Sequence, residues 1–187
     1  MDTDSKSATL RWWQSMMLSS AELTAKHIKP APSAYKARLR RCETAEAAML
    51  TDGFNALWFS LPEKVTNTDK PQDMLRWACI AVALSHVKST TGKSIASEAG
   101  KNGDADKSIV SELRFSQLQN AKTPEEFLRR LRRVIQQLKG GVSPVSLAED
   151  IYQWFAEHDQ FRPRRADKRI AVRWAMEYYR AAGSTKN

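Results

Sequence analysis

The 187-residue sequence has few helix-breaking residues, few cysteines and no apolar run long enough for a membrane. Glycine and proline occur seven times each, which favours helical structure. The two cysteines, Cys42 and Cys79, form no CxxC motif, as is typical of reduced thiols in a cytosolic protein. The strongest apolar run, WACIAVAL at 77–84, is too short to cross a bilayer. The polar N-terminus also lacks the apolar core of a signal peptide. We therefore expect a cytoplasmic protein with no membrane association.

Motifs of catalysis and metal binding are absent as well. The three histidines, His27, His86 and His158, have no acid or cysteine at ligand spacing, so we expect no metal site. The stretch TTGKS at 90–94 resembles the end of a phosphate-binding P-loop, but Val87 stands where that motif needs a glycine. No GxSxG, HExxH or Cys/His arrangement occurs. We predict a binding protein that is not an enzyme and needs no cofactor.

Positive charge is in excess. The chain has 30 Lys+Arg against 21 Asp+Glu, a net charge of +9. Such a balance suits an anionic partner such as nucleic acid, although it says nothing about the fold. Residues 1–100 carry 13 basic and 10 acidic side chains, whereas residues 101–187 carry 17 and 11. The surplus therefore rises from +3 to +6 along the chain.

Apolar residues recur at helical spacing in most segments, and alternating strand patterns are nearly absent. This predicts an all-α protein of two small helical bundles with about eight to nine helices. The polar segment GKNGDADK at 100–107 is the expected linker. The predicted domains are therefore 1–100 and the more basic 101–187. We expect helices near 8–18, 34–41, 44–60, 72–88, 108–120, 124–139, 146–157 and 166–181.

The helix expected at 124–139 has the clearest signals. Thr123 suits the N-cap, Glu126 completes a capping box, and Gly140 and Gly141 end the helix. An apolar stripe spans an arc of about 120° and comprises Phe127, Leu128, Leu131, Val134, Ile135 and Leu138. The opposite side carries Arg129, Arg130, Arg132 and Arg133.

Arginines on the outer face of a helix usually contact only solvent. For the helix at 124–139 this interpretation stays open beside that of a contact surface for phosphate. Two features weigh against contact with solvent alone. No acid occurs between 127 and 148, although surface helices normally interleave acids and bases. The basic residues are arginines, whose planar guanidinium matches phosphate.

Two other segments are rich in basic residues. The first basic segment, KARLRR, contains Lys36, Arg38, Arg40 and Arg41, and the second is the 129–133 stretch. The third basic segment contains Arg162, Arg164, Arg165, Lys168, Arg169 and Arg173. If its helix has already begun at 165, Arg165, Arg169 and Arg173 share one stripe, with Glu177 as a partner for Arg173. Three such segments could line one groove, but the sequence does not place them on one face.

Four stretches, taken in order, resemble a known family. They are LRWW at 10–13, YKARLRRCETAEAA at 35–48, the segment from SELRF to IYQWF at 111–155, and KRIAVRWAMEYY at 168–179. Together they resemble the CasB family, the small subunit of the type I-E CRISPR Cascade complex. One departure is Lys36, where an arginine is expected; lysine keeps the charge but suits bidentate phosphate contacts less well.

The resemblance implies an all-α protein of two small bundles without enzymatic activity, acting in antiviral defence. It implies as partners the backbone and large Cascade subunits, a second copy of the chain, the guide RNA, and single-stranded and hybrid target DNA. The basic residues in matching segments are Arg38, Arg40, Arg41, Arg114, Arg129, Arg130, Arg132, Arg133, Lys168, Arg169 and Arg173. Arg162, Arg164 and Arg165 are added on charge alone.

We therefore expect nucleic-acid binding without sequence specificity, which stabilises the guide RNA–target DNA hybrid and the displaced strand of the R-loop. The alternative is a protein scaffold that bridges subunits with little contact to nucleic acid. In that case an exposed Trp12 or Trp13 would anchor a partner.

Overall fold

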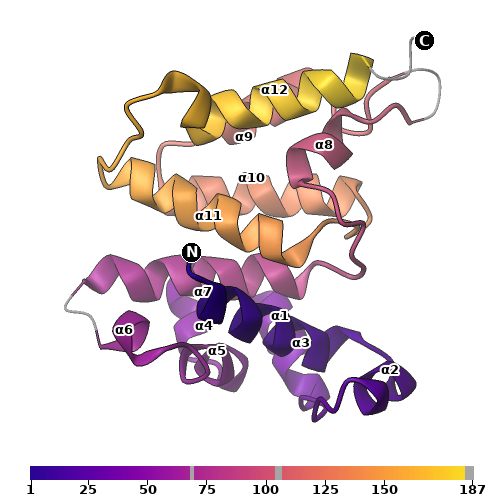
Figure 1. The fold of residues 1–187 in the computed structure, drawn as a ribbon, viewed down its shortest axis with the longest axis vertical. Helices are drawn as coiled ribbons and strands as arrows, with labels where there is room; N and C mark the ends of the chain where they lie inside the picture. The colour runs from indigo at the N-terminus through magenta and orange to yellow at the C-terminus, as the bar shows by residue number, and fades with distance from the viewer. Residues whose placement is uncertain (68–69, 104–106, 184–187) are drawn as a thin grey trace. The chain divides into compact units, whose positions relative to one another are not determined.

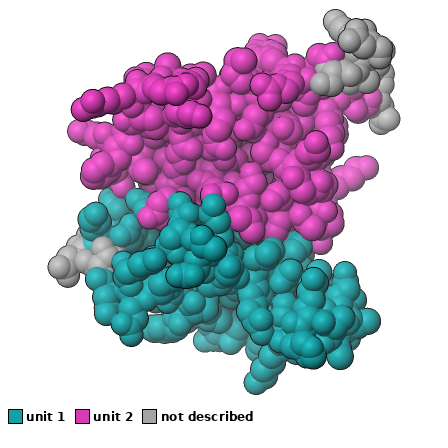
Figure 2. All heavy atoms as spheres, viewed as in Figure 1, with its two compact units in different colours: residues 1–86 teal, residues 87–187 magenta. Residues whose placement is uncertain are grey.

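A computed structural model describes residues 1–67, 70–103 and 107–183 of the chain. In these ranges it contains 12 α-helices and no β-strand, which confirms the all-α prediction. The chain divides into two compact units, residues 1–86 and 87–187 (Figures 1 and 2). No helix within the described ranges has both the length and the hydropathy to cross a bilayer.

Unit 1 is built around α7, a long helix that is buried from Arg76 to Ser85. Its elements are α1 (Thr3–Met17), α2 (Ser20–Ala25), α3 (Ser33–Arg41), α4 (Ala45–Met49), α5 (Asp52–Trp58), α6 (Glu63–Thr66) and α7 (Pro71–Ser85). Every residue from Trp77 to Leu84 is fully buried, and α3, α4 and α5 all pack against α7. A helix that is apolar all round must be covered on several sides, which explains why short helices surround it.

The two tryptophans of α1 belong to the core. Trp12 and Trp13 are 6% and 2% exposed, and Trp12 Nε1 donates to the Gly53 carbonyl at 3.0 Å. The expectation that one of them is an exposed anchor for a protein partner is therefore wrong. The two tryptophans are adjacent in α1, and both side chains are buried.

Unit 2 has an aromatic core to which four helices contribute. Its elements are α8 (Ile95–Gly100), α9 (Glu112–Gln119), α10 (Pro124–Gln137), α11 (Pro144–His158), the 3₁₀ turn η2 (Ala166–Lys168) and α12 (Ile170–Gly183). Phe127 of α10 stacks on Trp154 of α11 with ring centroids 4.1 Å apart. Phe115 of α9 stacks on Tyr178 of α12 at 5.0 Å. Offset ring stacking adds to the area that these residues bury, and it holds α9 through α12 as one bundle.

Helix α8 belongs to this second unit through its close packing on α12. A Cβ at Gly100 would collide with the main-chain carbonyl of Tyr178, so only glycine allows the two helices to approach this closely. The polar segment at 100–107 predicts a domain boundary at residue 100, whereas the compact units divide after His86. The division into two folding domains stays a prediction, and residues 104–106 of the expected linker lie outside the described ranges.

The helix expected at 44–60 is two helices, α4 and α5. Thr51 interrupts it, because its hydroxyl donates to the Ala48 carbonyl at 2.7 Å and accepts from the Phe54 amide at 3.2 Å. A threonine hydroxyl that bonds nearby main-chain groups takes the place of the helical hydrogen bonds that those groups would otherwise make. Three short helices, α2, α6 and α8, were not predicted.

Candidate nucleic-acid interface

Helix α10 forms where and how its sequence indicates. Thr123 caps it by accepting from the Glu126 amide at 3.2 Å. The Glu126 carboxylate accepts from the Lys122 amide at 2.8 Å, one residue before the expected capping-box partner. All six residues of the apolar stripe are buried, and Gly140 with φ +82° follows the end of the helix. The orientation of α10 fixes its polar face outward.

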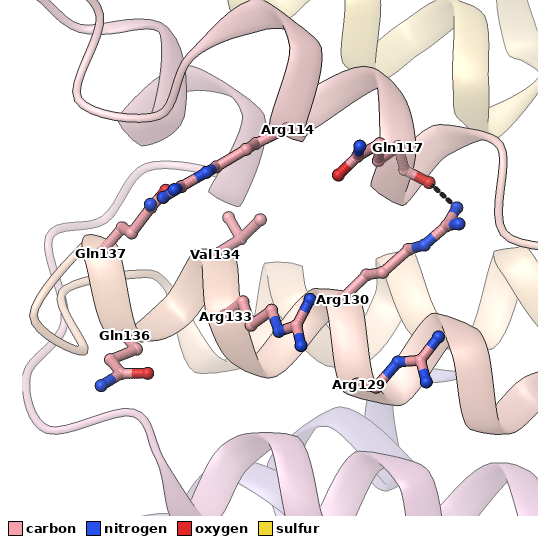
Figure 3. Close-up of a pocket in the computed structure, with 8 residues that line it drawn as sticks. All are labelled: Arg114, Gln117, Arg129, Arg130, Arg133, Val134, Gln136 and Gln137. Atoms are coloured by element: carbon pink, nitrogen blue, oxygen red, sulfur yellow. Dashed lines mark hydrogen bonds between the residues drawn. The ribbon is translucent and has the colours of Figure 1, made fainter.

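A hollow of about 650 Å³ lies between this polar face and α9 (Figure 3). We call it the arginine hollow. Its lining is Arg114 and Gln117 from α9 with Arg129, Arg130, Arg133, Val134, Gln136 and Gln137 from α10. Arg114 extends from α9 toward Gln137 (Figure 3). Arg129 and Arg130 project from one turn of α10, and Arg133 projects from the next (Figure 3). Two segments that are distant in sequence thus bring four guanidinium groups to one hollow.

The charge of the arginine hollow is not balanced by its walls. Among the described residues, none of the lining side chains is acidic. Arg114, Arg129 and Arg133 are exposed, and like charges gathered around a concave surface raise the local potential. An anion entering the hollow relieves this repulsion, so the arrangement suits a phosphate or another polyanion.

Arg130 differs from the other three arginines. It pairs with the Glu126 carboxylate and donates to the Gln117 carbonyl across the hollow (Figure 3). The bond to Gln117 ties α10 to α9, and the ion pair with Glu126 compensates the positive charge of Arg130. Arg132 is half-buried and does not line the hollow. The arginines of the second basic segment are therefore not equivalent. Arg129 and Arg133 line the hollow and are exposed to solvent, whereas Arg130 and Arg132 are half-buried.

The first basic segment lies on α3, in unit 1. Arg40 Nε donates to the Ser85 carbonyl at 2.7 Å, at the C-terminal end of α7, where carbonyl groups lack helical partners. Arg38 pairs with Asp52 at 3.2 Å on the surface. Arg41 is exposed. Arg40 thus helps to hold α3 on α7, whereas Arg38 and Arg41 are both exposed.

The third basic segment does not form one helical stripe. Arg165 and Arg169 precede α12 and have extended backbone conformations, so the predicted stripe of Arg165, Arg169 and Arg173 is wrong. Arg165 donates to both carboxylate oxygens of Asp167 at 3.0 and 2.8 Å, and Arg169 Nε donates to the Pro163 carbonyl at 3.3 Å. Arg162, Arg164 and Lys168 are exposed.

The break before α12 has a tertiary cause. Gln153 of α11 donates to the Lys168 carbonyl at 2.6 Å, and the Glu157 carboxylate accepts from the Ile170 amide at 2.7 Å. Glu157 therefore caps α12 from a neighbouring helix. A cap supplied from 13 residues away leaves no local signal in the sequence.

Arg173 faces inward toward a buried carboxylate. It donates to Asp150 at 2.6 Å and to Gln153 at 2.9 Å, and Trp174 Nε1 donates to the other Asp150 oxygen at 2.9 Å. Burial raises the pKa of Asp150 from 3.8 to about 6, outweighing Arg173 and these hydrogen bonds, which lower it. The predicted partner Glu177 lies farther away, at 4.0 Å. Arg173 is thus mainly a structural residue that joins α12 to α11.

The structure therefore brings together only part of the predicted set. Arg114 meets Arg129, Arg130 and Arg133, although 15 to 19 positions separate them in sequence. The glutamines of the lining were not predicted. Gln136 and Gln137 lie in the acid-free run from 127 to 148, whereas Gln117 lies outside it. Among the described residues, no cluster of three or more His, Cys, Asp or Glu has the arrangement of a metal site.

A family comparison covers most of the chain. The model of the CRISPR-associated protein Cse2 family matches residues 35–179. All candidate basic residues from Arg38 to Arg173 fall in this range, whereas the LRWW stretch lies before it. Searches of curated proteins and of solved structures gave no match.

Proposed function

Because the chain belongs to the CRISPR-associated Cse2 family, the small subunit of type I-E Cascade that is also called CasB, we propose that it binds nucleic-acid backbones without reading base sequence. The arginine hollow carries this proposal. It gathers four guanidinium groups, and none of its described lining side chains is a carboxylate. Glutamine side chains beside them supply further hydrogen-bond donors for phosphate or sugar oxygens.

The proposed role is to stabilise an R-loop. Pairing of the guide RNA with its target displaces the other DNA strand, and this exchange is nearly balanced in free energy. Contacts to the displaced strand and to the hybrid backbone favour the open state, because re-annealing has to break them. The chain's own residues hold phosphates in this role; it needs no cofactor and no catalytic step.

The accessible arginines, Arg114, Arg129 and Arg133, are the proposed main contacts. Arg41, Arg162, Arg164 and Lys168 are exposed and stay candidates. Arg38, Arg40, Arg130, Arg165, Arg169 and Arg173 already make internal contacts, so an incoming phosphate has to compete with those contacts. Arg132 also stays a candidate, away from the hollow.

The test is binding of a labelled single-stranded DNA to the purified chain over a series of salt concentrations. Phosphate contacts release counterions, so log Kd should rise with log salt by about 0.7 per contact for a single strand. The triple variant Arg114→Ala, Arg129→Ala, Arg133→Ala should bind more weakly and lower this slope by about 2.

A charge-matched control separates the hollow from net charge. Lys26, Lys29 and Lys88 are exposed, and changing all three to alanine removes the same +3 charge. The control variant should keep nearly all of the salt slope. Equal losses in both variants would mean that total charge, and not the arginine hollow, governs binding. Wild-type affinity in the triple variant would reject the hollow as a contact surface.

We also propose assembly with the backbone and large Cascade subunits, a second copy of the chain and guide RNA, in the cytoplasm. Exposed apolar side chains such as Leu113, at 70% exposure, support protein contacts. Co-expression with those subunits and a guide RNA, followed by purification through a tag on this chain, tests the assembly. Recovery of the chain alone would contradict it.

A further inference from the structure

A second hollow, of about 700 Å³, adjoins the arginine hollow and shares Arg114 and Gln137 with it. We call it the tyrosine hollow. Its further lining comes from the C-terminal part of α12, the start of α9 and the segment before α9, and includes Tyr178, Tyr179, Glu112 and Lys107. The two hollows are therefore contiguous at Arg114 and Gln137, and their linings differ in chemistry.

Tyr179 presents an accessible and well-held aromatic ring in this hollow. The residue is 52% exposed, although its neighbour Tyr178 is 4% exposed and stacks in the core. The Tyr179 hydroxyl donates to the Glu112 carboxylate of α9, and its ring meets the Tyr178 ring edge to face at 5.5 Å and 87°. The hydrogen bond to Glu112 raises the pKa of Tyr179, so the phenol stays a donor. Two contacts thus orient a ring that remains half-exposed to solvent.

The two hollows differ in the ligand group that they suit. The arginine hollow has cations and no described carboxylate in its lining, which suits phosphate. The tyrosine hollow contains Glu112, which partly offsets the positive charge of Lys107 and Arg114 in the same lining. It also contains the hydroxyls of Ser108 and Ser111 and the amide of Gln137. Carboxylate, hydroxyl and amide groups are partners for the polar edge of a nucleobase, and an aromatic ring is a partner for its face.

We propose that Tyr179 is a stacking platform for one unpaired nucleobase of a strand whose phosphates lie in the arginine hollow. The proposal rests on the proposed function and deepens it, because it adds a base contact to a backbone contact. The base has to be unpaired, since neighbouring pairs cover both of its faces in a duplex. Stacking tolerates any base, so the site selects single strands over duplexes without reading sequence.

The test compares the affinities of wild type, Tyr179→Ala and Tyr179→Phe for labelled single-stranded DNA and RNA of equal length. Loss of one base–aromatic stack should weaken the alanine variant about 5- to 150-fold. The phenylalanine variant keeps the ring and should stay within about threefold of wild type. The strand type that shows the loss identifies whether the site takes DNA, RNA or both.

Three controls make the result specific to a base. Phe59→Ala removes another exposed aromatic, 80% exposed and in unit 1, and should leave affinity unchanged. An abasic strand and a DNA duplex should bind wild type and Tyr179→Ala equally well. Circular dichroism melting of each variant verifies that the fold is retained.

The outcomes separate the two proposals. If Tyr179→Ala binds single strands as tightly as wild type while the triple arginine variant is weakened, the stacking site is overturned and backbone binding stands. An equal loss on abasic strands would also overturn it. If neither DNA nor RNA binds the wild type, the proposed function itself fails. If Tyr179→Ala loses only its Cascade partner subunits, Tyr179 is a protein contact and the stacking site is overturned.

Discussion

The second and third basic segments look alike in sequence but differ in the structure. On α10, Arg129 and Arg133 face a hollow without a described carboxylate in its lining. Before and within α12, Arg165 pairs with Asp167, and Arg173 pairs with the buried Asp150. A cluster of arginines in sequence therefore indicates a surplus of charge, but only the placement of acids shows which arginines can take an external anion.

The strongest test of this contrast is Arg173→Ala, which should destabilise the fold. It leaves the fully buried Asp150 without its ionic partner. Because the Arg173 side chain is itself 31% exposed, the expected loss is that of an unsatisfied buried polar group, about 1 to 3 kcal/mol. Urea unfolding followed by circular dichroism measures the change. A loss below about 0.5 kcal/mol, within the range of ordinary surface substitutions, would show that Arg173 is no more structural than the hollow arginines.

The second prediction concerns binding by individual arginines of α10. Arg133→Ala should weaken single-stranded DNA binding about tenfold with little change in stability, because it removes one charge-assisted hydrogen bond. Arg130→Ala should weaken binding less and lower stability by about 1 kcal/mol, since Arg130 is already held by Glu126 and Gln117. Fluorescence anisotropy and thermal melting of both variants test the contrast. A larger affinity loss in Arg130→Ala would reverse the assignment.

The third prediction concerns pH. Asp150 has a pKa of about 6 in the folded chain against an ordinary value of 3.8. A raised carboxyl pKa means that the folded state holds the proton more tightly, so its stabilising contribution is complete below about pH 4 and disappears as pH rises through about 6.

Between about pH 5 and pH 7 this group should lower the free energy of unfolding by about 1 kcal/mol. Asp150→Asn, which keeps an oxygen acceptor for Trp174 Nε1, lacks this titration. Urea unfolding at each pH gives the free energy of unfolding of both proteins. The wild-type value minus that of the variant should fall by this amount between about pH 5 and pH 7. Parallel profiles would contradict the titration of Asp150 in this range.

The smallest expected effect is that of Arg165→Ala. Its pair with Asp167 is exposed, with 74% and 55% of the two side chains accessible, and exposed pairs contribute about 0.5 kcal/mol or less. Stability should barely change, and DNA affinity should fall less than in Arg133→Ala. A greater affinity loss than in Arg133→Ala would place the main contact surface on the third segment.

Local sequence signals predicted α10 almost completely. Its cap, its apolar stripe and its terminating glycine all lie within 19 residues, from Thr123 to Gly141. The same kind of signal failed at Thr51, because apolar spacing continued on both sides while a single hydroxyl ended α4 and capped α5. It failed again at Arg169, because the cap of α12 comes from Glu157.

The site shows the same division. Periodicity was sufficient to turn the arginines of α10 outward, since an amphipathic helix has to bury its apolar face. Tyr179 also carried a usable signal, because it follows the core residue Tyr178 by one position and so points about 100° away from it. The resemblance of quoted stretches to the CasB family predicted the family that the match over residues 35–179 shows.

The sequence by itself thus determined the all-α class, the orientation of the α10 arginines and the family, because these depend on local spacing and on residue identity. Only the tertiary structure decided that Arg114 joins Arg129, Arg130 and Arg133 around one hollow while Arg173 turns toward Asp150. Those pairings depend on how α9 packs against α10 and α11 against α12. The aromatic core of the same bundle joins α9 to α12 and α10 to α11. Packing between helices brings together residues that no local spacing relates.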